Sequence, residues 1–233
     1  MKAILICIRS LFICLCSTAS AVEPEWSTVE HHNFELDAVG SLPAGFSFAK
    51  SESGKPGRWT VRSVDDAPSG RNVLVQSDAD RSEDRFLMAV ADRPKLRDVR
   101  VSVRCKPIAG NVDQACGIVF RYQSATDYYL ARSNALEGNV RLYHVRSGQR
   151  RQLANWEGQI RTGVWQELAA EIVANRIRIF FDGEEVISKS DRTFYEAGAV
   201  GLWVKADSVT AFDELNIASP ASNSERRDSH TTP

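Results

Sequence analysis

The stretch that decides the fold runs from residue 98 to residue 153 and reads DVRVSVRCKPIAGNVDQACGIVFRYQSATDYYLARSNALEGNVRLYHVRSGQRRQL. At its start, Val99, Val101 and Val103 alternate with polar residues. A period of two places one side-chain face in a core and the other in water, which is typical of a strand. The whole stretch predicts five consecutive strands with short polar turns, at 99–106, 116–122, 128–133, 140–146 and 149–153.

The same pattern continues on both sides of this stretch. Asp182-Gly183 is a strong hairpin signal between alternating segments, and we find no amphipathic helix of useful length in the mature chain. Many short strands with turn residues between them indicate an antiparallel β-sandwich or jelly roll. The further strands are predicted at 59–64, 72–76, 165–173, 176–181, 186–187, 199–205 and 209–217, with a strand broken by a turn across 33–48.

The chain ends are expected to lie outside this sandwich. Lys2 and Arg9, an apolar run over 11–16 and Ala19-Ser20-Ala21 have the form of a cleavable export signal. The alternative is an uncleaved membrane anchor, but the apolar run is shorter than the ~20 residues that a spanning helix needs. We therefore predict an exported protein, periplasmic or secreted, without a membrane span after cleavage. The predicted organisation is a signal peptide at 1–21, an N-terminal lead at 22–32, the sandwich at 33–218 and a disordered tail at 219–233.

Charge argues against a nucleic-acid partner. The 233 residues include 29 basic and 30 acidic ones, a formal net charge of −1. Loss of Lys2 and Arg9 with the signal peptide would make this −3, whereas nucleic-acid-binding domains are strongly basic.

Two cysteines remain after the signal peptide. Cys105 shares a strand face with the alternating valines, and Cys116 shares one with Ile118 and Phe120. Both sulfurs should therefore point into the same core across neighbouring strands, and in an oxidising compartment this pair predicts a disulfide. The alternative is two buried free thiols.

Seven strand-like segments together resemble the concanavalin A-like lectin and glucanase superfamily. Within it, the chain looks most like the laminin-G-like branch and the 3-keto-disaccharide hydrolase domain family, over residues 33–218. The resemblance implies a jelly roll of two curved sheets, with saccharides bound on the concave sheet or its rim. The segments are GIVFRY (117–122), DYYLAR (127–132), NVRLYHV (139–145), GVWQELAAEIV (163–173), IRIFFDGEEV (177–186), GAVGLWV (198–204) and AFDELNI (211–217).

Several members of this superfamily also carry a calcium ion, and the resemblance implies that Asp37 and Asp213 could serve it here. The alternative is an Asp that caps a turn and an Asp on a solvent-facing strand, because a calcium site needs six or more oxygens. The sequence predicts no other cofactor.

The sequence contains no diagnostic catalytic set. Retaining glycosidases need two carboxyl groups ~5 Å apart, close to the reach of side chains at i and i+2 on one strand face. Glu167, Ala169 and Glu171 lie in that register, but the segment has no Glu-x-Asp-x-x-Glu motif and no third acid. We favour a polar strand face as the explanation, because isolated acids in this register are common on exposed faces. His144 is the single histidine inside a predicted strand, and it has no identifiable partner.

Arginine and tyrosine concentrate in the central strands instead. Alternation places Ile118 and Phe120 inward, and therefore Arg121 outward. It likewise places Val140 and Leu142 inward, and Arg141 and Tyr143 outward. An outward surface of aromatic rings and guanidinium groups suits sugars, because rings pack on C–H faces and arginines donate to hydroxyls or carboxylates. The alternative is cross-strand pairing that stabilises a solvated sheet. The candidate ligand-binding residues are Arg121, Tyr129, Arg132, Arg141 and Tyr143.

These features favour an exported glycan-recognising protein without an evident catalytic acid pair. Its expected ligand is a carbohydrate or another small anionic or polar molecule. Two alternatives remain open: a periplasmic hydrolase or lyase acting on 3-keto-disaccharides or related glycosides, and a cell-envelope interaction domain.

Overall fold

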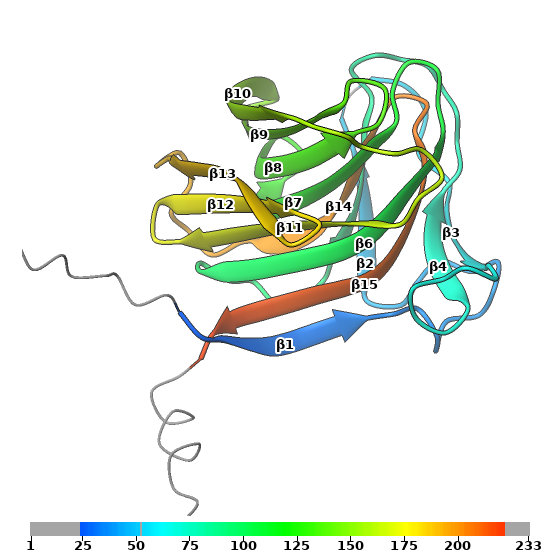
Figure 1. Ribbon diagram of the computed structural model, residues 1–233, viewed down its shortest axis with the longest axis horizontal. Helices are drawn as coiled ribbons and strands as arrows, with labels where there is room; N and C mark the ends of the chain where they lie inside the picture. Colours follow the sequence, from blue (N-terminus) through cyan, green and yellow to red (C-terminus); the bar gives the residue numbers. More distant parts are fainter. Residues whose placement is uncertain (1–23, 52, 222–233) are drawn as a thin grey trace, which may run out of the picture.

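The computed structural model describes residues 24–51 and 53–221, and in these residues two antiparallel sheets pack face to face (Figure 1). The β-sandwich jelly roll expected from the sequence is confirmed. Sheet A contains, in spatial order, β13 (Glu184–Ser190), β12 (Arg176–Phe181), β11 (Gln166–Val173), β6 (Val99–Ala109), β15 (Val209–Pro220), β4 (Asn72–Gln76) and β3 (Trp59–Ser63), with β1 (Trp26–His32) also paired to β15. Sheet B contains β10 (Gln149–Glu157), β9 (Asn139–Arg146), β8 (Asp127–Asn134), β7 (Ala115–Ser124), β14 (Ala199–Lys205), β5 (Phe86–Ala91) and β2 (Phe46–Lys50).

The core lies between the two sheets and follows the alternation in the sequence. Val99, Val101 and Val103 of β6 are fully buried in it, as are Ile118 and Phe120 of β7. The polar residues between the three valines are only partly buried. The five strands predicted between residues 99 and 153 are all present.

The two ends of the chain differ from the prediction. The segment expected as a lead includes β1, which pairs with β15 from Trp26↔Pro220 to His32↔Leu215, so the sheets extend beyond 33–218 in both directions. Residues 33–45 form turns rather than a broken strand, because Phe34 adopts φ 60° and buries its ring in the core. The predicted signal peptide at 1–21 and most of the predicted disordered tail lie outside the described residues.

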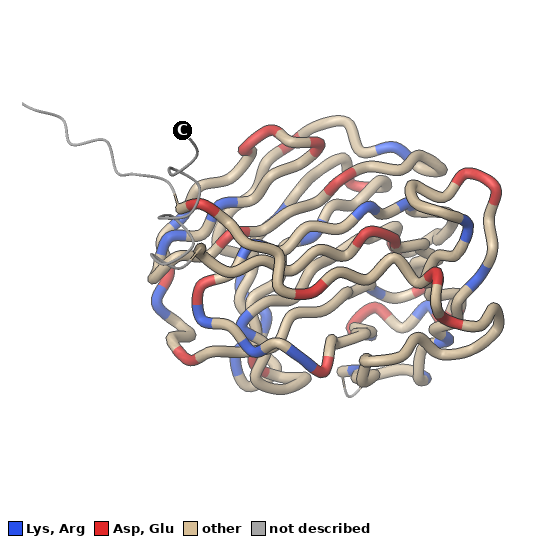
Figure 2. The backbone as a smooth tube through the Cα atoms, turned by 90° about the horizontal axis from the view of Figure 1, so that it is seen from below, with Lys and Arg blue, Asp and Glu red and all other residues tan. Residues whose placement is uncertain are grey.

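Lys and Arg are interspersed with Asp and Glu along the chain (Figure 2). Among the described residues, no helix is long and apolar enough to cross a membrane.

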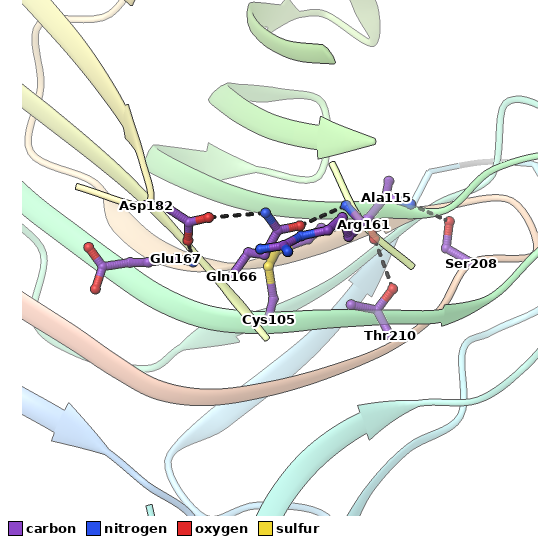
Figure 3. Close-up of a disulfide and its surroundings, with 9 residues drawn as sticks. Cys105, Ala115, Arg161, Gln166, Glu167, Asp182, Ser208 and Thr210 are labelled. Atoms are coloured by element: carbon purple, nitrogen blue, oxygen red, sulfur yellow. Dashed lines mark hydrogen bonds between the residues drawn. A yellow bond between two sulfur atoms is a disulfide. The ribbon is translucent and has the colours of Figure 1, made fainter. Parts of the chain in front are cut away.

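The predicted disulfide is confirmed, and it joins the two sheets. Cys105 lies in β6 of sheet A and Cys116 in β7 of sheet B, with a Cα–Cα distance of 6.3 Å. Beside it, Ala115 donates from its backbone N–H to Ser208 Oγ at 3.0 Å and accepts from Thr210 Oγ1 at 2.9 Å (Figure 3). These bonds tie the start of β7 to the start of β15, so the bridge lies in a region where the two sheets are closely connected.

Removing this bridge is expected to lower the free energy of unfolding by about 2–3 kcal/mol, because a short closed loop restricts the unfolded chain by that amount. The measurement is urea denaturation of the oxidised wild type and the Cys105→Ala/Cys116→Ala variant. A reductant should destabilise the wild type and leave the variant unchanged. Equal stability of the reduced and oxidised wild type would contradict this prediction.

Candidate ligand-binding face

The outer face of sheet B, which points away from the core, has an apolar floor. Met88, Val119, Tyr128 and Trp203 are fully buried there. Gly117 makes room for the indole, because a Cβ at this position would come within 2.9 Å of Trp203 Cε3. This face is therefore not a solvated polar surface over most of its area.

Sheet B curves until its outer face is concave. The guanidinium carbon of Arg150 in β10 lies 4.8 Å from the ring centre of Phe86 in β5 and 4.9 Å from that of Tyr143 in β9. Four strands separate β10 from β5 in the sheet, which in a flat sheet would place them about 24 Å apart. Arg150 thus reaches across the concave face and covers its aromatic floor.

Two polar atoms in this floor make no hydrogen bond to a described residue. They are the hydroxyl of Tyr128 and the indole nitrogen of Trp203. Burial raises the pKa of Tyr128, and the nearby Trp203 indole opposes this in part, although the pair lacks good hydrogen-bond geometry. Buried polar groups are normally paired, so these two atoms are exceptions within a closely packed floor.

A polar network covers the other end of the face. Arg132 Nη1 donates to Asn139 Oδ1 at 2.6 Å, and Arg132 Nη2 donates to Glu137 Oε2 at 2.8 Å. The same carboxylate oxygen lies 2.8 Å from Arg141 Nη1. Arg141 Nε donates to Asn155 Oδ1, also at 2.8 Å. One carboxylate therefore holds two guanidinium planes in fixed positions.

Electrostatics keep Glu137 ionised. Burial alone would raise its pKa, but the charge and hydrogen bond of Arg132, together with Asn139 and Arg141, lower it below its ordinary value. Arg141 is half-buried, so part of its guanidinium can still donate to a ligand. Such a fixed arginine suits bidentate donation to a carboxylate or to adjacent hydroxyl groups.

Three of the five predicted site residues meet on this face: Arg132, Arg141 and Tyr143. Arg132 and Tyr143 are almost fully buried, since Tyr143 lies under the guanidinium of Arg150. The predicted surface of open aromatic rings is therefore not what the structure has here. Arginine and amide groups are exposed, and the rings lie beneath them.

The prediction that Arg121 faces outward is wrong. It is fully buried with φ 45°, at a bulge where the pairing of β7 with β8 shifts. Its guanidinium donates to the carbonyl oxygens of Arg97 at 2.7 Å, Phe194 at 2.6 Å and Ala174 at 2.7 Å. These acceptors lie in loops beside sheet A, so the structure does not bring Arg121 to the candidate face.

Tyr129 is also not on this face. Its ring is fully buried in the core, stacked 5.4 Å from the ring of Phe120. Its hydroxyl donates to Asp191 Oδ1 at 2.6 Å and accepts from the backbone N–H of Thr193. Burial, followed by the hydrogen bond to Asp191 and the charge of that carboxylate, raises the pKa of Tyr129 to about 12. The hydroxyl secures the loop before β14.

Asp37 and Asp213 each accept backbone hydrogen bonds. Asp37 Oδ1 accepts from Ala44 N at 2.8 Å, and Asp213 Oδ2 accepts from Ser69 N at 3.0 Å. In the described part of the chain, no three His, Cys, Asp or Glu side chains are grouped so that they could hold a metal ion. Calcium binding at this pair stays a prediction.

The two strand acids have different surroundings. Glu171 is buried on the outer face of sheet A between Arg100 and Arg178, and it pairs with both guanidinium groups. Glu167 is only half-buried. Two arginines thus neutralise Glu171, which gives it a structural role in sheet A.

His144 has a partner in the structure. Its Nδ1 atom lies 2.8 Å from the hydroxyl oxygen of Thr193.

Sequence reasoning missed Arg150. The alternation of residues 150 and 152 in the sequence indicates that Arg150 and Gln152 share one strand face. The contact with Phe86 is not indicated, because Phe86 lies 64 positions earlier in the chain and near the opposite edge of the sheet. A cleft of about 470 Å³ opens beside this contact, between the ends of β2 and β5 and the turns that join β7 to β8 and β9 to β10. No local signal in the sequence indicates this cleft, because it depends on the curvature of the sheet.

Comparison with known proteins identifies relatives in structure alone. No family model matches the sequence, and no curated protein matches it. Carbohydrate-binding module CBM66 from Bacillus subtilis superposes with a TM-score of 0.60 at 21% identity, over 75% of this chain and 96% of that one.

Two further solved structures have similar scores. Cellulose-induced protein Cip1 has a TM-score of 0.58 at 13% identity, over 82% of this chain and 97% of that one. Domain 4 of AbnA, an extracellular arabinanase from Geobacillus stearothermophilus solved with arabinotriose, has a TM-score of 0.56 at 15% identity, over 88% and 97%. The chain therefore has the jelly-roll β-sandwich fold that these carbohydrate-related structures share.

Proposed function

We propose that this protein recognises a glycan on the concave face of sheet B, through Arg141 and Asn155, with Arg132 and Glu137 holding Arg141 in place. The observation that carries the proposal is the fixed and still partly exposed guanidinium of Arg141 on a concave sheet face. Asn155 and Gln152 are exposed on the neighbouring strand and can both donate and accept. Hydroxyl groups of a sugar match this mixture.

The comparisons support the ligand class, although they share only the fold with this chain. One similar structure is described as a carbohydrate-binding module, and another was solved with arabinotriose. We also propose that the protein works outside the cytoplasm, in the periplasm or the medium. The disulfide supports this, because such bonds persist in oxidising compartments.

Replacing Arg141 by alanine should weaken glycan binding about tenfold, the effect expected for one lost charged hydrogen-bond donor. Calorimetric titration, with ligands chosen by glycan array, measures this. Arg62→Ala is the control, since Arg62 is exposed on β3 of sheet A. Equal affinities of the wild type and Arg141→Ala would exclude the proposed surface.

A further inference from the structure

The cleft beside Arg150 lies at a different part of the concave face from Arg141. The serine and threonine residues in its wall are Ser51, Ser53, Thr126 and Ser147, and the charged ones are Asp84 and Arg150. Its volume of about 470 Å³ falls within the range of small-ligand sites. It is therefore large enough for a ligand and mostly polar.

Arg150 is held in place without using its hydrogen-bond donors. Phe86 and Tyr143 lie 4.8 Å and 4.9 Å from its guanidinium carbon, an arrangement that attracts the cation to both rings. Among the described residues, no acceptor bonds to this guanidinium, whereas Arg121 and Arg132 each bond to three groups or more. Arg150 thus presents up to five N–H donors at a fixed place.

Asp84 is the complementary group in the same cleft. Its backbone carbonyl accepts from Ser51 Oγ at 2.7 Å, which fixes the end of the loop. Its carboxylate has no hydrogen bond or ion pair to any residue that the structure describes, and it does not pair with Arg150. A group that only donates and a group that only accepts therefore border one cleft without meeting.

The presence of both Arg150 and Asp84 in the cleft restricts the kind of ligand that can bind there. A carboxylate or phosphate in the cleft would be repelled by Asp84, and a cation would be repelled by Arg150. A hydroxyl can accept from Arg150 and donate to Asp84 at the same time. Adjacent hydroxyl groups on one sugar ring could accept from Arg150 and donate to Asp84. The ring itself would then displace water from the cleft.

We propose that this cleft is a second binding site, which takes one neutral sugar unit whose hydroxyls bridge Arg150 and Asp84. The proposal rests on the proposed glycan recognition and adds a site that is separate from Arg141. The neutral unit bound here is one end of the glycan or a separate saccharide. In either case an acidic sugar in the same cleft is disfavoured.

The test maps neutral and acidic probes onto the protein. Arabinotriose, cellotriose and trigalacturonate are titrated into ¹⁵N-labelled protein, and the shifted amide resonances are assigned. A neutral trisaccharide should shift the amides of Ser147, Gly148 and Asp84, and trigalacturonate should shift them less. Arg150→Ala and Asp84→Asn should each weaken this binding about tenfold, while Arg151→Ala, on the opposite side of the same strand, should not.

Each outcome separates this site from the proposed surface. Shifts confined to residues around Arg141 and Asn155 would overturn the cleft site and leave the proposed function intact. Shifts confined to the cleft would support the cleft site and overturn the surface at Arg141. No shift with any of the three probes would overturn both. Asp84→Asn is the variant expected to fold like the wild type, because Asp84 is exposed and asparagine has nearly the same shape without the charge. A loss of binding in this variant therefore does not result from misfolding.

Discussion

Replacing Arg121 by alanine is expected to destabilise the protein by about 3–5 kcal/mol, the range for breaking a buried charged network. The loss follows from the acceptors left behind. The carbonyls of Arg97, Ala174 and Phe194 and the carboxylate of Asp98 would all lose the guanidinium that joins them, and a cavity would replace a fully buried side chain. Urea denaturation followed by tryptophan fluorescence measures the change.

The control is Arg151→Ala, because Arg151 is exposed on β10 and surface replacements of this kind stay within about 0.5 kcal/mol. At temperatures where Arg121→Ala is folded, its glycan affinity should equal that of the wild type, since its guanidinium lies away from the concave face. A loss of less than 1 kcal/mol, on the scale of one ordinary hydrogen bond, would contradict the structural role.

The failure to place Arg121 from the sequence has a local cause. Strict alternation holds in β7 up to Phe120, which pairs with Tyr129. The register then shifts before Ser124 pairs with Asp127, and Arg121 takes a left-handed conformation. A bulge of this kind turns a side chain to the other face of the sheet. Neither glycine nor proline marks the position, so nothing in the local sequence indicates the bulge.

Arg141 and Tyr143 face outward as the alternation predicts, and Arg132 shares their face, because short connections fix the register of these strands. Arg132 pairs directly with Arg141, and Leu130 pairs with Tyr143, on each side of a turn that includes Gly138. Alternation on two strands joined by a tight turn is sufficient to predict a shared face. Their burial was not predictable, because Arg150 covers this face only through the curvature of the whole sheet.

The same distinction explains the disulfide. Two alternating segments with inward cysteines predicted that Cys105 and Cys116 share a core, which the structure confirms. The expectation that the bridge joins neighbouring strands is wrong, because the two strands belong to opposite sheets. A sandwich core receives side chains from both sheets, so inward orientation alone cannot distinguish a bridge across the core from one between neighbouring strands.

Asp213 predicts an unusual dependence of stability on pH. Its carboxyl group is fully buried on β15 under the loop that contains Ser69. Burial raises its pKa from 3.8 to about 6, and the charges of Glu214 and Glu35 act in the same direction, although the backbone N–H groups of Ser69 and Glu214 oppose the shift. The folded protein therefore holds a proton on Asp213 that the unfolded chain releases between about pH 4 and pH 6.

The sign of the effect follows from that proton. The contribution of Asp213 is most favourable below pH 4 and is lost as the pH rises through 6. A shift of this size corresponds to about 3 kcal/mol. The free energy of unfolding of the wild type minus that of Asp213→Asn should thus fall by about 2 kcal/mol from pH 4 to pH 7, since part of the change already lies below pH 4, as measured by urea denaturation at each pH.

Asp127→Asn provides a control of opposite sign. Hydrogen bonds from the backbone N–H of Ser147 and the hydroxyl of Thr126 lower the pKa of Asp127, so its contribution is present at neutral pH and is lost as the pH falls. Because both the folded and the unfolded pKa of Asp127 lie near or below 4, the difference between the wild type and Asp127→Asn should rise below pH 4 and stay nearly level from pH 4 to pH 7, while that for Asp213→Asn shrinks. If the difference between the wild type and Asp213→Asn did not change with pH, the carboxyl group of Asp213 would be solvated like an ordinary surface acid. The burial of Asp213 under the loop that contains Ser69 would then be contradicted.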